Sequence, residues 1–87
     1  MGEVAGHAAV IAHLTGLGVR LDVATMYADA FVDYQEAVAN IRQHGTIVAH
    51  PRTHNPMPNP YLDVRDRARA TLQRLNVRQA ADLWRAE

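Results

Sequence analysis

The sequence has 87 residues, so we expect a single domain, residues 1–87, whose small core makes its stability marginal. It contains no cysteine, which excludes disulfides, thiolate metal sites and catalytic thiols. Nine arginines balance nine acidic residues, so the net charge of zero does not favour bulk nucleic-acid binding, and no stretch approaches the roughly 20 apolar residues of a membrane span.

Apolar residues at helical spacing predict a first short helix from Glu3 to Thr15. Its apolar positions are Val4, Ala8, Ile11 and Leu14. The sequence Gly16-Leu17-Gly18 is expected to end this helix.

The second predicted helix is the clearest element of the sequence. Asp22 is placed to cap its start, and Gly45 follows its expected end at His44. Between them, apolar residues alternate at spacings of three and four: Ala24, Tyr27, Phe31, Tyr34, Val38 and Ile41. This pattern predicts a long helix that packs in a hairpin or bundle.

Residues 45–60 contain four prolines within ten positions and therefore cannot be helical. Thr46 to Ala49 could form one short strand. A connection of this length is unusual in a compact domain and is often functional.

Asn59-Pro60 predicts the start of a third helix, with asparagine at the cap and proline at the first helical position. Its apolar stripe consists of Tyr61, Val64, Ala68, Leu72 and Leu75. A last short helix is predicted from Asn76, with Gln79 in the capping-box position. The sequence therefore predicts an all-α fold: a long helical hairpin over about residues 22–75, flanked by a short N-terminal and a short C-terminal helix.

Charges of opposite sign lie on different helices. The second helix carries an acidic face formed by Asp29, Asp33 and Glu36. From Asp63 to Arg78, five arginines and two aspartates leave a local charge of plus three. These arginines are Arg65, Arg67, Arg69, Arg74 and Arg78.

Three interpretations of these charges remain open. They could be solvated faces, partly neutralised by an Asp63–Arg67 pair at helical spacing. The acidic face of one subunit could instead contact the arginines of a neighbour and set the register of that contact. In the third interpretation the arginines, with Arg52 in the loop, contact DNA phosphates. For contacts between subunits, the candidate interface consists of these acidic residues together with Tyr27, Phe31 and Tyr34.

Catalytic and cofactor chemistry finds little support in the sequence. His50 and His54 flank Pro51 in a proline-rich loop, and no cysteine or carboxylate lies nearby in sequence to complete a metal site. No glycine-rich phosphate loop or lysine is present, which excludes an NTPase of the P-loop type. We therefore expect no enzymatic activity, no metal and no cofactor.

The aromatic residues of the long helix are most simply core, while Trp84 is open to two interpretations. It could fold back onto the hairpin, or it could dock on a partner together with Leu83.

The order of these features resembles that of the tailed-phage terminase small subunits, in the short helical branch associated with Hong-Kong-type siphophages. The resemblance covers about residues 22–75. It rests on the segment MYADAFVDYQEAVANIRQHG, a short Thr-Ile-Val segment and a loop, and then NPYLDVRDRARATLQRL.

This resemblance implies a non-catalytic adaptor in the cytoplasm of an infected bacterium. Such proteins assemble into homo-oligomeric rings, engage double-stranded phage DNA and recruit the large terminase subunit, which supplies the ATPase and nuclease. The alternative is a small helical interaction or regulatory module that makes no DNA contact. No membrane association is expected in either case.

Overall fold

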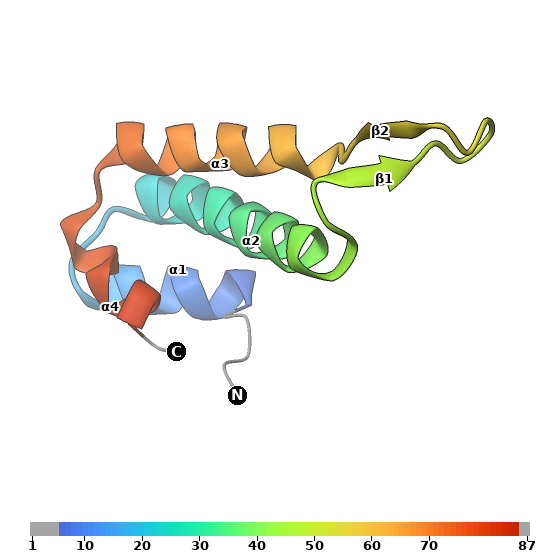
Figure 1. The fold of residues 1–87 in the computed structure, drawn as a ribbon. Coiled ribbons are helices and arrows are strands. Elements are labelled where there is room, and N and C mark those ends of the chain that lie inside the picture. The colour runs from blue at the N-terminus through green and yellow to red at the C-terminus, as the bar shows by residue number, and fades with distance from the viewer. Residues whose placement is uncertain (1–5, 86–87) are drawn as a thin grey trace.

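The computed structural model describes residues 6–85 and confirms the predicted helical hairpin with a short helix at each end (Figure 1). The elements follow in the order α1 (His7–Gly16), α2 (Leu21–His44), β1 (Ile47–Ala49), β2 (Pro56–Pro58), α3 (Tyr61–Leu75), the 3-10 helix η1 (Arg78–Ala80) and α4 (Ala81–Arg85). Helix α2 lies between α3 on one side and α1 and α4 on the other (Figure 1).

The molecule is elongated because the strands project away from the helices (Figure 1). Its radius of gyration is 14.9 Å, whereas a compact domain of this length would have about 12 Å. The two strands and their loop form an arm, residues 46–59, that extends beyond the end of α2 and the start of α3.

Helix α1 begins later than the sequence pattern predicted. Gly6 is in an extended conformation just before the first helical residue, and a glycine favours helix formation less than other residues do. Val10 and Leu14 are fully buried, Ile11 is half-buried, and Ala8, which we assigned to the apolar stripe, is exposed. The predicted start at Glu3 and the contribution of Val4 fall outside the described residues.

The start of α2 also differs from the prediction, whereas its end agrees with it. Arg20 occupies the cap position, so Asp22 lies inside the first turn, where its carboxylate accepts a hydrogen bond from the Arg20 guanidinium at 2.8 Å. A negative charge there is favourable because it lies near the positive end of the helix dipole. Gly45 follows the last turn with a φ of +84°, and its amide donates to the carbonyl of Ile41 at 2.7 Å.

Helix α2 supplies most of the core because it is covered on two sides. Tyr27 and Phe31 of the predicted seam are buried, and Tyr34 is half-buried. Small side chains that we did not assign to the seam are buried as well, and they allow close packing: Ala28, Ala30 and Ala37.

The arm contains two antiparallel strands, whereas the sequence predicted only one. Val48 pairs with Met57, and the flanking pairs are Ile47 with Pro58 and Ala49 with Pro56. Proline cannot donate a ladder hydrogen bond, yet Pro56 and Pro58 both belong to β2. Both stand at positions whose main-chain groups point away from β1, so the ladder loses no bond.

A buried asparagine joins the arm to both long helices. The Asn59 side chain is 2% exposed and donates from Nδ2 to Asn40 Oδ1 and to the Gly45 carbonyl, each at 2.9 Å. Its Oδ1 accepts from the Tyr61 amide at 2.9 Å, which confirms Asn59 as the cap of α3. Its main-chain amide donates to the Thr46 carbonyl at 2.8 Å.

The end of the chain follows a different path from the predicted one. Asn76 ends α3 in a left-handed conformation, with φ of +48°, instead of starting a helix. The turn of η1 then leads into α4, and no side-chain capping bond forms at its start, so the capping box with Gln79 is wrong.

Candidate functional site

The arginines of α3 lie at the surface because the other side of this helix packs on α2. Ala68 and Leu72 are buried against α2 and Leu75 is half-buried. Tyr61 and Val64, the first residues of the predicted stripe, are 40% and 37% exposed. We use "arginine surface" for the following five residues: Arg65, Arg67, Arg69, Arg74 and Arg78.

Two members of the arginine surface share one carboxylate. Arg65 Nε donates to Asp66 Oδ1 at 3.0 Å, and Arg69 Nη2 donates to the same oxygen at 3.2 Å. The predicted Asp63–Arg67 pair does not form. Within residues 6–85, Arg67, Arg74 and Arg78 have no ion-pair partner, so their charges are the less compensated part of the surface.

A groove of about 420 Å³ runs between α2 and α3, with walls of opposite charge. Asp29 and Asp33 line it from α2, and Arg67 and Arg74 line it from α3. Its apolar lining consists of Met26, Ala30, Val64, Ala68 and Leu75. We call it the charged groove. No ion pair within 4.0 Å crosses it among the described residues, so Asp33, Arg67 and Arg74 are not paired across the groove.

The residues predicted for an oligomer interface occupy different environments. Asp29 pairs with His7 of α1, while Asp33 and Glu36 are exposed. Tyr27 and Phe31 are only 4% and 2% exposed, so they have almost no surface with which to contact a neighbour. Only the carboxylates and half-buried Tyr34 remain accessible.

Trp84 folds back onto α2, which is the first of the two predicted arrangements. Its Nε1 donates to the Tyr27 hydroxyl at 2.9 Å, and its ring meets Phe31 edge-on, with centroids 4.8 Å apart. Burial raises the pKa of Tyr27, and the hydrogen bond from Trp84 opposes part of that rise. One edge of the tryptophan still faces solvent, because the residue is 39% exposed, while Leu83 is half-buried.

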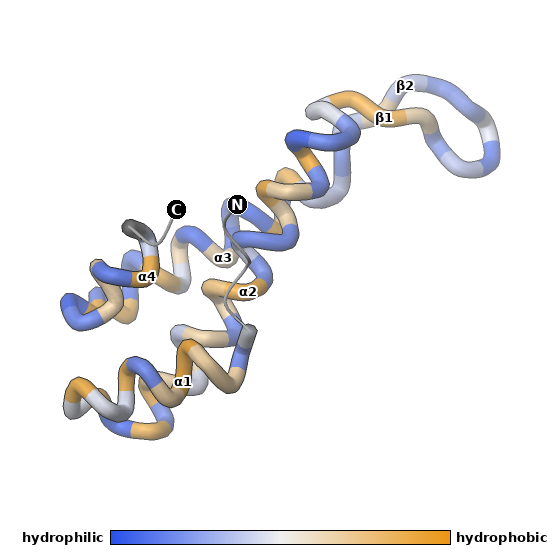
Figure 2. The backbone as a smooth tube through the Cα atoms, turned by 90° about the horizontal axis from the view of Figure 1, so that it is seen from below, coloured by the Kyte–Doolittle hydropathy of each residue, from blue (hydrophilic) through white to orange (hydrophobic). Residues whose placement is uncertain are grey.

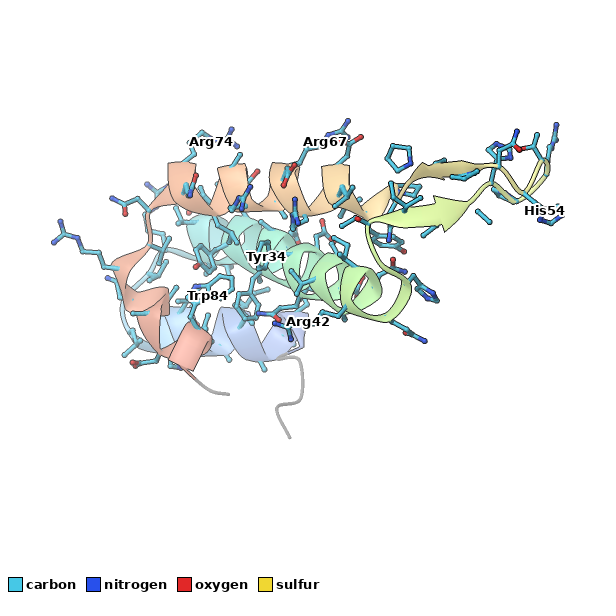
Figure 3. The ribbon with its side chains drawn as sticks, viewed as in Figure 1. Tyr34, Arg42, His54, Arg67, Arg74 and Trp84 are labelled. Carbon is cyan, nitrogen blue, oxygen red and sulfur yellow. The ribbon has the colours of Figure 1, made fainter. Side chains whose placement is uncertain are left out.

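The histidines of the arm have a structural role at its tip. His50 Nδ1 accepts hydrogen bonds from the Arg52 and Thr53 amides at 3.1 and 3.3 Å, which closes the loop between the strands. His54 lies at this tip, far from Arg67 and Arg74 (Figure 3), and exposed Arg52 belongs to the same loop between the strands. Within residues 6–85, no group of three His, Asp or Glu side chains is placed to hold a metal ion.

Sequence reasoning missed the features that depend on contacts between helices. The Asn40–Asn59 bond and the His7–Asp29 pair join residues 19 and 22 positions apart, and no local pattern predicts them. Met26 of the charged groove was also missed, although an exposed apolar residue beside the seam of the long helix could have indicated it, whereas Val64 belongs to the predicted stripe. In the described part of the chain, no helix combines the length and apolar character needed to cross a membrane.

A protein-family model described as phage terminase, small subunit matches residues 9–78. The match runs from α1 to η1 and so includes both long helices, the arm and the charged groove. No curated protein and no solved structure matches the chain. The family match covers well over half of the sequence and confirms the predicted resemblance. The chain therefore belongs to the phage terminase small-subunit family, which acts in the packaging of phage DNA.

Proposed function

We propose that this chain is the adaptor of a phage packaging motor, which assembles as a homo-oligomeric ring, binds viral duplex DNA and recruits the large terminase subunit. The large subunit supplies the ATPase and nuclease, so the adaptor itself is not an enzyme. It acts in the cytoplasm of the infected bacterium. The observation that carries this proposal is the arginine surface, of which all residues but half-buried Arg65 are exposed while the apolar side of α3 packs on α2.

Charge separation within the chain supports DNA contact despite its net charge of zero. Four arginines and two aspartates give α3 a charge of plus two. Arg78 extends this surface, and Arg52 adds a separate contact at the tip of the arm. A ring repeats the surface around one axis, so weak contacts accumulate. Phosphate contacts carry little sequence information, so we expect specificity to come from DNA bending.

The DNA proposal predicts how salt changes the affinity. Arg67 and Arg74, which lie on the outer side of α3 (Figure 3), should contribute most to DNA affinity. Arg65 and Arg69 should contribute less, because both already form ion pairs with Asp66. The slope of log affinity against log salt should fall by about 0.9 for each phosphate contact that is removed.

The experiment compares Arg67→Ala/Arg74→Ala with the parent in a duplex titration at several salt concentrations. Arg42→Ala is the matched control, because Arg42 is exposed on the opposite side of the body (Figure 3). Loss of affinity and of slope in the double variant alone supports the proposal. If the oligomer persists and both variants bind like the parent, α3 is not the DNA surface.

The charged groove suggests how neighbouring subunits are held together. Contacts in a ring join two different surfaces of the same chain, and here an acidic surface that includes Asp33 and Glu36 is available to meet the arginines of a neighbour. We expect Asp33→Arg to weaken self-association in sedimentation, and a second change, Arg67→Glu, to restore part of it. Asp63→Arg is the control, because Asp63 is exposed on α3 outside the groove. Equal oligomers for the parent and Asp33→Arg would refute this interface.

The groove also favours the second candidate function, a helical interaction module without DNA contact. Its apolar lining and volume of about 420 Å³ suit a side-chain row from a partner helix. This function requires a parent chain that stays monomeric or dimeric and a duplex affinity that does not depend on Arg67 and Arg74.

Recruitment of the large subunit is assigned to the exposed edge of Trp84 and the neighbouring Leu83. Trp84→Phe keeps an aromatic ring on α2 but shortens that edge. It should reduce stimulation of the large-subunit ATPase while helical circular dichroism stays unchanged. Full stimulation by this variant would place the docking surface elsewhere.

A further inference from the structure

The two strands of the arm have free edges of opposite character. The rungs on either side of the paired residues are fixed by hydrogen bonds from the His50 amide to the Asn55 carbonyl and from the Asn59 amide to the Thr46 carbonyl, each at 2.8 Å. Antiparallel ladders bond at every second residue. The main-chain groups of the intervening residues therefore point outward: Ile47 and Ala49 on β1, and Pro56 and Pro58 on β2.

The outer edge of β2 cannot pair fully with another strand, because prolines occupy its outward positions. Pro56 and Pro58 have no N–H, so the outer edge of β2 has no donor at either outward position. Proline on an edge strand is a known protection against unwanted strand pairing. In this arm the protection covers β2 only.

The outer edge of β1 stays open over a short, defined stretch. The alternation of the ladder leaves the N–H and C=O groups of Ile47 and Ala49 outside the pairing with β2, and in the described part of the chain no main-chain group beyond the strands bonds them. The stretch ends at Gly45, whose amide and carbonyl are bonded to Ile41 and Asn59, and at Pro51, which has no amide hydrogen. The edge therefore offers the two N–H donors and two C=O acceptors of Ile47 and Ala49, which are spaced as an additional antiparallel strand requires.

The side chains beside this edge are apolar and exposed. Ile47 is 60% exposed, and Figure 2 shows hydrophobic residues along β1 followed by a hydrophilic tip. A shallow cavity of about 240 Å³ lies on the arm, lined by Ile47, Val48, Ala49, His54 and Pro56. A hairpin of two strands is only marginally stable in water, and a third strand would strengthen it.

We propose that the open edge of β1 binds an extended segment of a partner protein as a third strand, and that this segment carries carboxylates at its ends. Residues 45–60 contain one fixed charge, Arg52, and no aspartate or glutamate, so the arm complements an acidic segment. Main-chain bonds to Ile47 and Ala49 provide the affinity, and an apolar side chain of the segment enters the cavity. This proposal goes beyond the adaptor function and does not depend on ring formation or on DNA binding.

A second copy of the chain fits this edge less well. Antiparallel pairing of two β1 strands about Val48 would place Arg52 opposite His44 of the second copy, with no carboxylate on either arm. Duplex DNA can accept a two-stranded ribbon in its major groove, but Arg52 would be the arm's only fixed positive charge.

The test uses the full chain and two synthetic peptides of alternating valine and threonine, one with two glutamates at each end and one with lysines instead. Binding is followed by NMR titration and by amide hydrogen exchange. The glutamate peptide should slow exchange at Ile47 and Ala49 about tenfold or more, and the lysine peptide should bind more weakly.

Ala49→Pro removes one outward donor and leaves the bonds of the His50 and Asn59 rungs in place. It should weaken binding of the glutamate peptide about fivefold or more, the equivalent of one hydrogen bond. Ala49→Ser keeps the amide and should bind like the parent. Protection of the His50 and Asn59 amides verifies that the arm of each variant is folded.

Three results would overturn the proposal. The first is no protection at Ile47 and Ala49 with the glutamate peptide, or equal binding of both peptides. The second is unchanged affinity in Ala49→Pro with a folded arm. The third is protection that develops with protein concentration alone, or with duplex DNA alone, because the occupant would then be a second copy or a nucleic acid.

Discussion

Replacing Asn59 by alanine perturbs the one residue that bonds to α2, to the arm and to α3 at once. Its side chain makes three hydrogen bonds, to the Asn40 side chain, the Gly45 carbonyl and the Tyr61 amide, each 2.9 Å long. Alanine removes all three but keeps the main-chain bond to Thr46, so the strands can still pair.

The expected loss of stability is the sum of the contributions of the three hydrogen bonds. Removing a helix cap costs about 1 kcal/mol, and each of the two bonds made by Nδ2 contributes about 1 kcal/mol. Asn40 is half-buried and Gly45 is exposed, so both partners can turn to water and add no large desolvation penalty. We therefore expect Asn59→Ala to lower the free energy of unfolding by about 3 kcal/mol, which corresponds to a fall in Tm of about 12 °C or more.

Urea unfolding followed by circular dichroism measures this loss. Asn55→Ala is the matched control, because Asn55 is exposed at the tip of the arm and should change stability by less than about 0.5 kcal/mol. Asn59→Asp keeps the acceptor for the cap but turns a buried carboxylate oxygen toward the Asn40 and Gly45 oxygens, so it should lose at least as much stability as Asn59→Ala. A loss below about 1 kcal/mol in Asn59→Ala, or an equal loss in Asn55→Ala, would refute the assigned role.

Three further outcomes are expected. Trp84→Ala should lower the free energy of unfolding by about 3 kcal/mol, because it removes the ring packed on Phe31 and the bond to Tyr27; an unchanged urea midpoint would contradict the packing. Because burial raises the pKa of Tyr27, the stability that it contributes is complete below pH 10 and declines as the pH rises through the folded-state pKa. Tyr27→Phe should flatten that alkaline decline, and equal pH profiles would show that another group is responsible. Leu14→Ala, at a position with 0% exposure, should cost about 3 kcal/mol in thermal unfolding, and a loss below about 1 kcal/mol would remove α1 from the core.

Elements set by local chemistry could be predicted from the sequence. Gly45 ends α2 because its positive φ is costly for other residues, and Asn59-Pro60 starts α3 because side-chain capping and a fixed φ act within a few residues. The second strand was missed because the general rule against proline in strands ignores register. Pro56 and Pro58 are tolerated only at outward positions, and the outward positions depend on pairing with β1.

For the candidate site, the charge of each helix could be predicted from the sequence, but the ion pairs could not. The sequence separates acidic α2 from basic α3, but it cannot show which charges are already paired. Arg65 and Arg69 converge on Asp66, although spacing suggested a pair between Asp63 and Arg67. Asp66 lies one residue from Arg65 and three from Arg69, so helical spacing permits these pairs as well as the Asp63–Arg67 pair, and the sequence alone does not decide between them.

The net charge of zero suggests an even balance of charge over the molecule, but the antiparallel packing of α2 and α3 separates the charges by sign. The two helices bring opposite charges to the two walls of one groove without joining them by an ion pair within the described residues. Ala68 and Leu72 are buried, which fixes the side of α3 that packs on α2, and Arg67 and Arg74 lie beside that contact, where they line the groove. Among the described residues, the arginines of the groove therefore have no ion-pair partner from α2, and this is the basis of the proposed contacts with a neighbouring subunit or with DNA.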